Sequence, residues 1–224
     1  MNGKFIAIDG TDGSGKATQT ELLVKKLKEE GHEVEVADFP QYGERSAVLV
    51  EDYLNGKFGS AKEVSPYQAS VFYAVDRYAA SFKIRRWLKE GKIVVANRYT
   101  SANMGHQTGK IKEKEERDMF LDWLDNFEFG IFNIPRPDMT LLLFVPPEIN
   151  KELVEEKGTR KYQKEGEVHD IHTKDQEHMK DASNAYKYVA EKYYWPIINC
   201  TENEKLKTRE EIHSLIWEKV KEIL

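Results

Sequence analysis

The chain has 224 residues, 33% of them charged and 40% hydrophobic, which is typical of a soluble globular protein with one good core. The formal net charge of −5 argues against a protein that binds nucleic-acid polymers, because such proteins present a basic surface. Cys200 is the only cysteine, which excludes an intrachain disulfide. With no signal-peptide pattern and no apolar run long enough to span a membrane, we expect a cytoplasmic protein.

The first predicted elements are a strand at residues 5–8, a glycine-rich turn and a helix up to about residue 30. The turn at residues 10–16 has the P-loop spacing of glycine, four residues, glycine and lysine. Its backbone N–H groups can wrap a phosphate, the positive end of the helix faces the same anion, and Lys16 can reach the outer phosphates. The candidate phosphate-binding residues are Gly10, Thr11, Asp12, Gly13, Ser14, Gly15, Lys16, Ala17 and Thr18.

One position departs from the P-loop pattern. The residue after the lysine is normally Ser or Thr, whose hydroxyl holds the metal beside the phosphates, but here it is Ala17. Thr18 lies about 100° further round the helix, so it does not automatically take over this role. The sequence therefore predicts nucleotide phosphate binding and leaves the handling of the metal open.

Strand and helix patterns alternate along the rest of the chain. Further strands are predicted at residues 34–37, 93–96, 139–145 and 197–198. Further helices are predicted through residues 48–54 and at 66–89, 113–127, 175–194 and from Thr208 onward. Gly31 and Gly91 are expected to end two helices, and Thr208 with Glu211 fits a capping box for the last one.

Five strands that alternate with helices predict an α/β protein, in which a five-stranded parallel sheet is covered by helices on both faces in three layers. Ligands of such folds bind beyond the carboxyl ends of the strands. The P-loop follows the first strand, Phe39-Pro40 the second and Asn97-Arg98-Tyr99 the third. We therefore expect loops from three strands to face one crevice.

Taken in order, these pieces resemble the thymidylate kinase family, whose members move the γ-phosphate of ATP to dTMP. The matching pieces, which span nearly the whole chain, are residues 8–16, 39–43, 76–77, 97–99, 137–138 and 145–148. The pattern Phe-Pro-x-Tyr-Gly and the unusual residue after the P-loop lysine are most similar to the actinobacterial branch. The resemblance implies one P-loop kinase domain over residues 1–224, with a lid segment at about 157–173.

The resemblance also implies three catalytic cations. Lys16 would hold the ATP phosphates, and Arg98 stands where the family's arginine touches the acceptor phosphate and the transferring group. The charged, aperiodic residues 157–170 resemble the lid that closes over ATP. Among its cations we choose Arg160 for the transition state, because arginine stacks and forks better than lysine. The other lid cations are Lys157, Lys161 and Lys164.

The acceptor site is expected on the helix at 66–89 and beyond the strand ends. Tyr73 and Arg77 lie four residues apart and share a helix face. The family has an aromatic ring over thymine at the first position, a stack worth about 1–3 kcal/mol, and an arginine at the base edge or phosphate at the second. Asn103 is expected at the thymine ring, where an amide can donate and accept at once. A core position for Tyr73 and a helix-surface position for Asn103 are the alternatives. The implied dTMP-binding residues are Asp12, Phe39, Pro40, Tyr42, Arg45, Tyr73, Arg77, Arg98, Asn103 and Gln107.

Mg²⁺ is the implied cofactor, with ATP as phosphate donor, and Asp12 and Asp9 are the carboxylates expected near it. Besides Ala17, two positions weaken this metal site. Asn97 replaces the family's usual Asp before Arg-Tyr, and Thr173 falls near where the lid helix often carries Glu. His106 stands where the family often has a Tyr that favours deoxyribose. The preference for dTMP over dUMP or other monophosphates therefore stays open.

The function implied is a cytoplasmic, ATP- and Mg²⁺-dependent dTMP kinase that makes dTDP for dTTP synthesis. Its partners would be ATP and dTMP, without nucleic-acid polymers or membranes, and a homodimer formed through helices such as 66–89. Two alternatives stay open: another nucleoside monophosphate or deoxynucleoside kinase, and a nucleotide-binding paralogue with weakened or lost catalysis.

Overall fold

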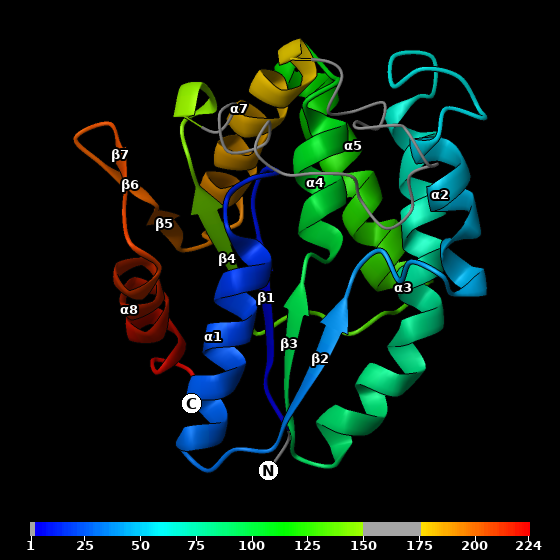
Figure 1. The fold of residues 1–224 in the computed structure, drawn as a ribbon. Helices are drawn as coiled ribbons and strands as arrows, with labels where there is room; N and C mark the ends of the chain where they lie inside the picture. The colour runs from blue at the N-terminus through cyan, green and yellow to red at the C-terminus, as the bar shows by residue number, and fades with distance from the viewer. Residues whose placement is uncertain (1–2, 150–175) are drawn as a thin grey trace.

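The computed structural model describes residues 3–149 and 176–224, and in this part of the chain a five-stranded sheet forms the middle layer (Figure 1). The strand order is β2-β3-β1-β4-β5, and every neighbouring pair is parallel. Helices lie on both sides of the sheet, which confirms the predicted three-layer α/β fold. The lid predicted at about 157–173 lies outside the described residues.

The sheet strands are β1 (Phe5–Asp9), β2 (Val34–Asp38), β3 (Ile93–Asn97), β4 (Met139–Phe144) and β5 (Ile197–Asn199). A small antiparallel hairpin of β6 (Thr201–Glu202) and β7 (Lys205–Leu206) follows β5 and was not predicted. The helices are α1 (Lys16–Glu29), α2 (Val48–Leu54), α3 (Pro66–Lys89), α4 (Thr100–Thr108), α5 (Lys114–Asp125), α7 (Gln176–Lys192) and α8 (Arg209–Val220). A 3-10 turn, η1 (Arg45–Ala47), precedes α2, and a π-helix, η2 (Asn126–Ile131), follows α5.

Different helices cover the two faces of the sheet, because successive residues of a strand point to opposite sides. On one face, Ile6 belongs to a core cluster with Leu23 of α1 and Ile216 of α8. On the other face, Phe5 packs in a cluster with Ile84 of α3. β1 is buried along its whole length, as expected of a parallel strand between two helical layers. This packing leaves the carboxyl ends of the strands to carry the loops of the site.

Helix α4 is an element that the sequence analysis missed. Its residues, Thr-Ser-Ala-Asn-Met-Gly-His-Gln-Thr, include several weak helix formers and one large apolar side chain, Met104, so they show no apolar stripe. Tertiary packing on α7 holds it instead. A Cβ atom on Gly105 would lie 2.5 Å from the Tyr186 ring, so glycine permits the close approach of the two helices. Asn103 on α4 is buried, which excludes the helix-surface alternative.

The helix predicted at 113–127 also ends differently. Regular α5 stops at Asp125, and the wider turn of η2 follows and carries a fully buried carboxylate, Glu128. Such π-helical turns occur frequently at functional sites. Among the described residues, no helix is both long enough and apolar enough to cross a bilayer.

Candidate active site

The P-loop connects β1 to α1 as the sequence predicts. Gly10, Gly13 and Gly15 all have positive φ angles, of 149°, 88° and 86°, and a Cβ on Gly10 would collide with the carbonyl oxygen of Leu143. Gly15 occupies the N-cap position of α1, and no side chain caps the helix. The first N–H groups of α1 therefore remain available to an anion at the carboxyl end of the sheet.

Lys16 is buried at the start of α1, and its side chain turns back across the loop. The Nζ atom donates a 2.7 Å hydrogen bond to the carbonyl oxygen of Thr11 and lies 3.5 Å from Ser14 Oγ. The ammonium group thus lies against the same turn whose N–H groups would bind phosphate. Ala17 is exposed and Thr18 is half-buried on the next positions of the helix.

Arg98 follows β3 and has a left-handed backbone, with a φ angle of 65°, while its N–H donates to Ile8 of the neighbouring strand. Its guanidinium donates to Asp12 Oδ1 in the P-loop and lies 3.7 Å from Asp9 Oδ1. Burial lowers the pKa of this guanidinium, but the charges of Asp12 and Asp9 raise it, and the net shift is upward. Arg98 therefore stays charged, with its orientation fixed beside the phosphate-binding loop.

His106 is a site residue that the sequence analysis did not assign. Arg98 Nη1 lies 3.1 Å from His106 Nε2. Because a guanidinium can only donate, the ring nitrogen is the acceptor in this contact. The ring also packs edge-on against Tyr186, with 5.3 Å between centroids. His106 thus helps to position Arg98, which a lone histidine in the sequence could not reveal.

The buried side chain of Asp9 stabilises the start of the P-loop. The carboxylate is fully buried and accepts hydrogen bonds from the Gly10 N–H at 2.8 Å, Ser101 Oγ at 2.6 Å and Tyr186 Oη at 2.9 Å. Burial, then the charge of Asp9, raises the pKa of Tyr186 well above its usual value, so Tyr186 remains a donor. Three elements, β1, α4 and α7, are thereby tied together at the phosphate end of the site.

The predicted acceptor residues on α3 and α4 are brought together. Arg77 is 1% exposed and pairs bidentately with Glu128, with Nε 2.6 Å and Nη2 2.7 Å from the carboxylate oxygens. Its Nη1 donates to the carbonyl oxygen of Tyr99 at 3.3 Å. Asn103 Nδ2 donates to Glu128 and to the carbonyl oxygen of Ser70, both at 3.1 Å. Glu128, which the sequence analysis did not single out, is the shared partner of both residues.

Tyr73 and Phe72 of α3 are both half-buried and pack against the same hydrophobic cluster, which includes Tyr53. Tyr73 is half-buried, with its ring edge-on to Tyr53 at 6.3 Å. Phe72 packs against Tyr53 and Phe58, as expected of a core residue. Gln107 is buried, and its Oε1 has no hydrogen-bond partner among the described residues.

The loop after β2 is held by Asp76, a residue in the matched motif that received no predicted role. Its carboxylate accepts from the Gln41 N–H at 2.8 Å, the Gln41 side chain at 3.0 Å and Ser46 Oγ at 2.6 Å. Phe39, predicted to bind dTMP, is 4% exposed, and its ring packs on Tyr99. The ring belongs to the core cluster that includes Ala96 of β3 and Ile84 of α3, and this packing anchors the loop.

The other predicted residues of this loop are more accessible. Pro40 follows a cis peptide bond and is half-buried, as is Tyr42, whereas Arg45 is exposed on η1. Asn97 donates from Nδ2 to Asp38 at 2.8 Å, so the amide that replaces the family's aspartate avoids placing two carboxylates together.

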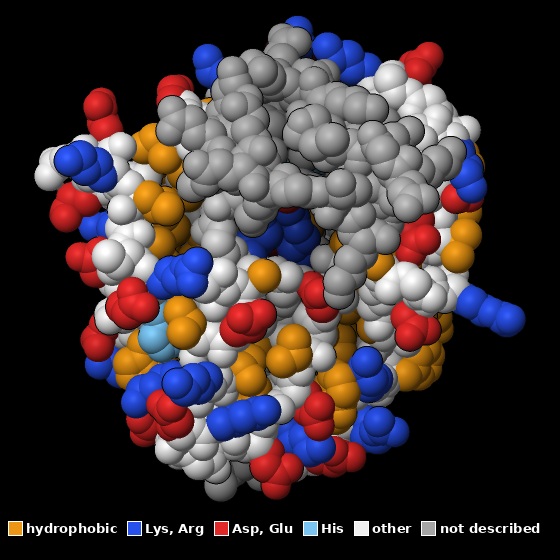
Figure 2. Space-filling view, viewed as in Figure 1, with side chains coloured by type: hydrophobic (Ala, Val, Ile, Leu, Met, Phe, Trp, Pro, Cys, Tyr) orange, Lys and Arg blue, Asp and Glu red, His pale blue; other side chains and the backbone are white. Residues whose placement is uncertain are grey.

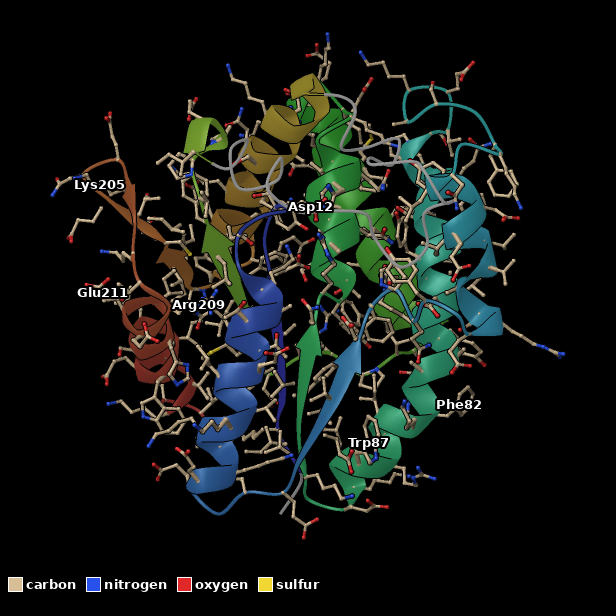
Figure 3. The ribbon with its side chains drawn as sticks, viewed as in Figure 1. Asp12, Phe82, Trp87, Lys205, Arg209 and Glu211 are labelled. Carbon is tan, nitrogen blue, oxygen red and sulfur yellow. The ribbon has the colours of Figure 1, made fainter. Side chains whose placement is uncertain are left out.

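Figure 3 places Asp12 at the carboxyl end of the sheet, above α1. Figure 2 shows a hollow on the same side of the molecule, with Lys or Arg side chains visible in its floor. Within residues 3–149 and 176–224, no group of three or more His, Cys, Asp and Glu side chains is arranged to hold a metal. Several predicted lid residues lie outside this part of the chain: Lys157, Arg160, Lys161, Lys164 and Thr173.

The chain is similar to known proteins along most of its length. The family model for thymidylate kinase matches residues 8–219. A thymidylate kinase of Mycobacterium tuberculosis is 30% identical over 146 residues, which cover 65% of this chain and 67% of the relative. A probable thymidylate kinase of Pyrococcus horikoshii is 30% identical over 160 residues, covering 71% and 73% of the two chains. The thymidylate kinase of Plasmodium falciparum is 27% identical over 221 residues, covering 99% and 91%.

A solved thymidylate kinase structure from Candida albicans superposes with a TM-score of 0.75 at 22% identity and covers 99% of this chain and 92% of its own, which supports the fold. Archaeal, protozoan and actinobacterial relatives match at similar identity. The predicted placement in the actinobacterial branch is therefore not supported.

Proposed function

Because the chain belongs to the thymidylate kinase family, we propose that it transfers the γ-phosphate of ATP to dTMP and releases dTDP, as a cytoplasmic step in dTTP synthesis. The observation that carries this proposal is the position of two cations beyond the carboxyl ends of adjacent strands. Lys16 follows β1 and Arg98 follows β3, and the P-loop carboxylate Asp12 binds Arg98. Phosphoryl transfer needs such positioning and charge neutralisation more than it needs covalent chemistry.

The residues would divide the work as follows. The N–H groups of the P-loop and Lys16 bind the donor phosphates, while Arg98 offers a planar fork to the oxygens of the group in transfer. Tyr73 provides the ring for the acceptor base, with Arg77 and Asn103 at the base edge. Asp12 and His106 keep Arg98 oriented before substrate binds. Arg160 in the lid segment at about 157–173 would add a cation when ATP is enclosed.

Mg²⁺, which would neutralise the phosphate charge, fits this site through few protein ligands. Asp9 is fully buried among three donors, whereas Asp12 is half-buried in the P-loop beside Arg98, so Asp12 is the carboxylate nearer to a hydrated ion. Mg²⁺ in nucleotide sites commonly uses one or two carboxylates together with substrate phosphates and water. We therefore expect the ion to depend mainly on the phosphates and Asp12, and little on the position of Ala17.

A magnesium titration beside Ala17→Ser tests both the reaction and this metal arrangement. The natural chain should form dTDP from ATP and dTMP in a coupled ADP-release assay, with a rate that rises from background as Mg²⁺ is added. Ala17→Ser should lower the half-saturating Mg²⁺ concentration by no more than about tenfold, because one added hydrogen-bonding group contributes about 1 kcal/mol.

Activity in Ala17→Ser together with none in the natural chain would instead indicate a binding protein that has lost its metal. A panel of dTMP, dUMP, UMP, dGMP and thymidine separates the other alternative. Turnover of dTMP no faster than background, with turnover of another member, would reassign the enzyme to another nucleoside or nucleotide kinase. Nucleotide binding by calorimetry without any transfer would favour the paralogue without catalysis.

We also propose that the chain forms a homodimer through α3 and α5. Ring contacts link Tyr67 to Trp123 at 4.7 Å, and Tyr78 to Phe82 at 5.4 Å and to Phe132 at 5.1 Å. Phe82 is 60% exposed, and Figure 3 shows it pointing away from the sheet. Tyr67, Val71 and Tyr78 of the same helix are also exposed, and apolar side chains gathered at the surface are typical of an interface between proteins.

Phe82→Glu should therefore convert a dimer into a monomer. A charge at this position would be buried without a partner in the interface, so we expect the dimer dissociation constant to rise at least about a hundredfold. Sedimentation velocity over a concentration series measures the change. Leu215→Glu on α8, a residue exposed to 41%, is the matched control and should leave the dimer intact. A Phe82→Glu dimer as tight as the natural one would exclude this face.

A further inference from the structure

Glu128 is a buried carboxylate to which the proposed phosphoryl transfer gives no role. It lies on η2, is 0% exposed, and comes from a segment between α5 and β4. Its two oxygens accept from Arg77 on α3, and one of them also accepts from Asn103 on α4. One carboxylate thus binds two of the residues expected at the acceptor base.

The surroundings of Asn103 leave a single possible orientation of its amide. Nδ2 lies 3.1 Å from the Ser70 carbonyl oxygen and 3.1 Å from Glu128 Oε1, and both partners can only accept. Turning the amide over would place Oδ1 against two acceptors. Both hydrogens of Nδ2 are therefore occupied, and Oδ1 remains as the group that can meet a ligand. The expectation that Asn103 donates and accepts at the base is corrected: it can only accept.

Arg77, in contrast, offers a ligand only hydrogen-bond donors. Of its five N–H groups, the contacts to Glu128 use two and the contact to the Tyr99 carbonyl uses one. One hydrogen remains on each terminal nitrogen, and these can only donate. Arg77 and Asn103, held by the same carboxylate, therefore combine a fixed donor with a fixed acceptor.

We propose that Glu128 is a positioning residue that sets the hydrogen-bonding polarity of the acceptor-base site, an inference that rests on the proposed dTMP site. Thymine and uracil present an O4 acceptor beside an N3–H donor, which complement the donor of Arg77 and the acceptor of Asn103. Cytosine presents an amino donor beside an N3 acceptor, so both contacts become repulsive. Glu128 thereby selects 4-oxo pyrimidines without touching the base.

A buried ion pair is a costly way to fill a core, because apolar residues of similar volume are often as stable. Glu128 and Arg77 are nevertheless fully enclosed, and a neutral core there would leave the orientation of the Asn103 amide to the Ser70 carbonyl alone. Selection by unpaired polar groups is strong, since a base of the wrong polarity leaves buried donors and acceptors without partners. Packing alone does not explain a carboxylate at position 128, whereas a role in selecting the acceptor base does.

Glu128→Gln tests the inference in the full-length protein, with kcat/KM measured for dTMP and for dCMP. Whichever way the glutamine amide lies, its NH₂ group faces an Arg77 donor, Nε or Nη2, so the pairing that fixes Arg77 and Asn103 is broken. We expect the ratio of kcat/KM for dTMP over dCMP to fall at least tenfold. Calorimetry with dTMP and dCMP should show the same change in relative affinity. A purely structural role would lower both values by the same factor and leave the ratio unchanged.

Two further variants keep the test decisive. Glu128→Asp retains the charge beside Arg77 and withdraws the oxygen from Asn103, so its ratio should also fall, even if Glu128→Gln does not fold. Asp118→Asn, which removes a carboxylate bound to Tyr188 and Lys192 on the far side of α5, should leave the ratio unaltered. Normal dTMP turnover with unchanged ratios in the Glu128 variants would overturn the role of Glu128 alone. Absence of dTMP binding by the natural chain would overturn the proposed function and this inference together.

Discussion

Arg98→Gly is expected to lower kcat for transfer to dTMP by about a thousandfold and to leave the protein folded. Arg98 supplies the fixed guanidinium beside the P-loop, bound by Asp12 and His106. Removing one preorganised donor from a transition state commonly costs 10²–10³-fold, and loss of a phosphoryl-transfer arginine costs about 10³–10⁵-fold. KM for ATP should change much less, because Lys16 and the loop N–H groups bind the donor.

Glycine is the informative substitution because of the backbone at this position. With a φ angle of 65°, Arg98 adopts a left-handed conformation that costs an ordinary residue about 1–2 kcal/mol and glycine almost nothing. Arg98→Gly should therefore melt at a higher temperature than Arg98→Ala, although both lose the same guanidinium. The left-handed backbone at Arg98 is unfavourable for folding but fixes the arginine. Strained residues of this kind cluster at functional sites.

The measurement is kcat and the melting temperature of the natural protein and the two variants. Arg86→Ala serves as the matched control, since Arg86 is an exposed arginine of α3 that lies 4.0 Å from Glu90. It should keep full activity. Arg98→Gly that retains kcat within tenfold, while correctly folded, would contradict the assignment of Arg98 to the reaction.

The fold was predictable because its signals are local. Strands between two helical layers are apolar along their whole length, and β3 shows this in four consecutive residues, Ile93 to Ala96. The capping box of Thr208 and Glu211 marks the start of α8, and the structure contains both of its hydrogen bonds. These features depend on neighbours in sequence, so composition and spacing reveal them.

The polar network of the site was not predictable in the same way. Glu128 and Arg77 are 51 residues apart, and Arg98 and Asp12 are 86 apart, so no spacing connects them. α4 has no apolar stripe because its buried residues are largely polar or small, and their partners come from β1, α3, α7 and η2. Tertiary contacts override weak propensity in this helix.

Motif agreement alone does not separate a residue that contacts substrate from one that packs beside the site. Phe39 was expected in the dTMP site because it belongs to a matched pattern, yet its ring lies in the core on Tyr99. A residue of a motif can hold a loop in place or contact a ligand, and the sequence alone does not distinguish these two roles. Asn97 shows the reverse case. In the sequence it reads as a carboxylate lost from the metal site, but in the structure its amide donates to Asp38, where a second carboxylate would be repelled.

Lys16→Met should lower kcat/KM for ATP by at least about a thousandfold, the second large effect expected of this site. Methionine matches the length of lysine and removes only the charge and the donors, so the ATP phosphates lose their mobile cation while the loop glycines stay in place. The fold should not suffer, because Nζ is buried against Thr11 and Ser14 and its desolvation is unfavourable without phosphate.

Lys26→Met on the same helix provides the comparison, since Lys26 pairs with Glu30 at the surface. Surface pairs contribute about 0–1 kcal/mol, so this variant should keep its activity. Calorimetry with ATP and with dTMP separates two explanations of the lower activity expected of Lys16→Met. Weakened ATP binding with dTMP affinity unchanged would place the lysine on the donor side, as the position of Nζ over the P-loop requires. Equal loss for both nucleotides would mean that Lys16 supports the loop rather than the phosphates, and a retained kcat/KM would remove it from the reaction.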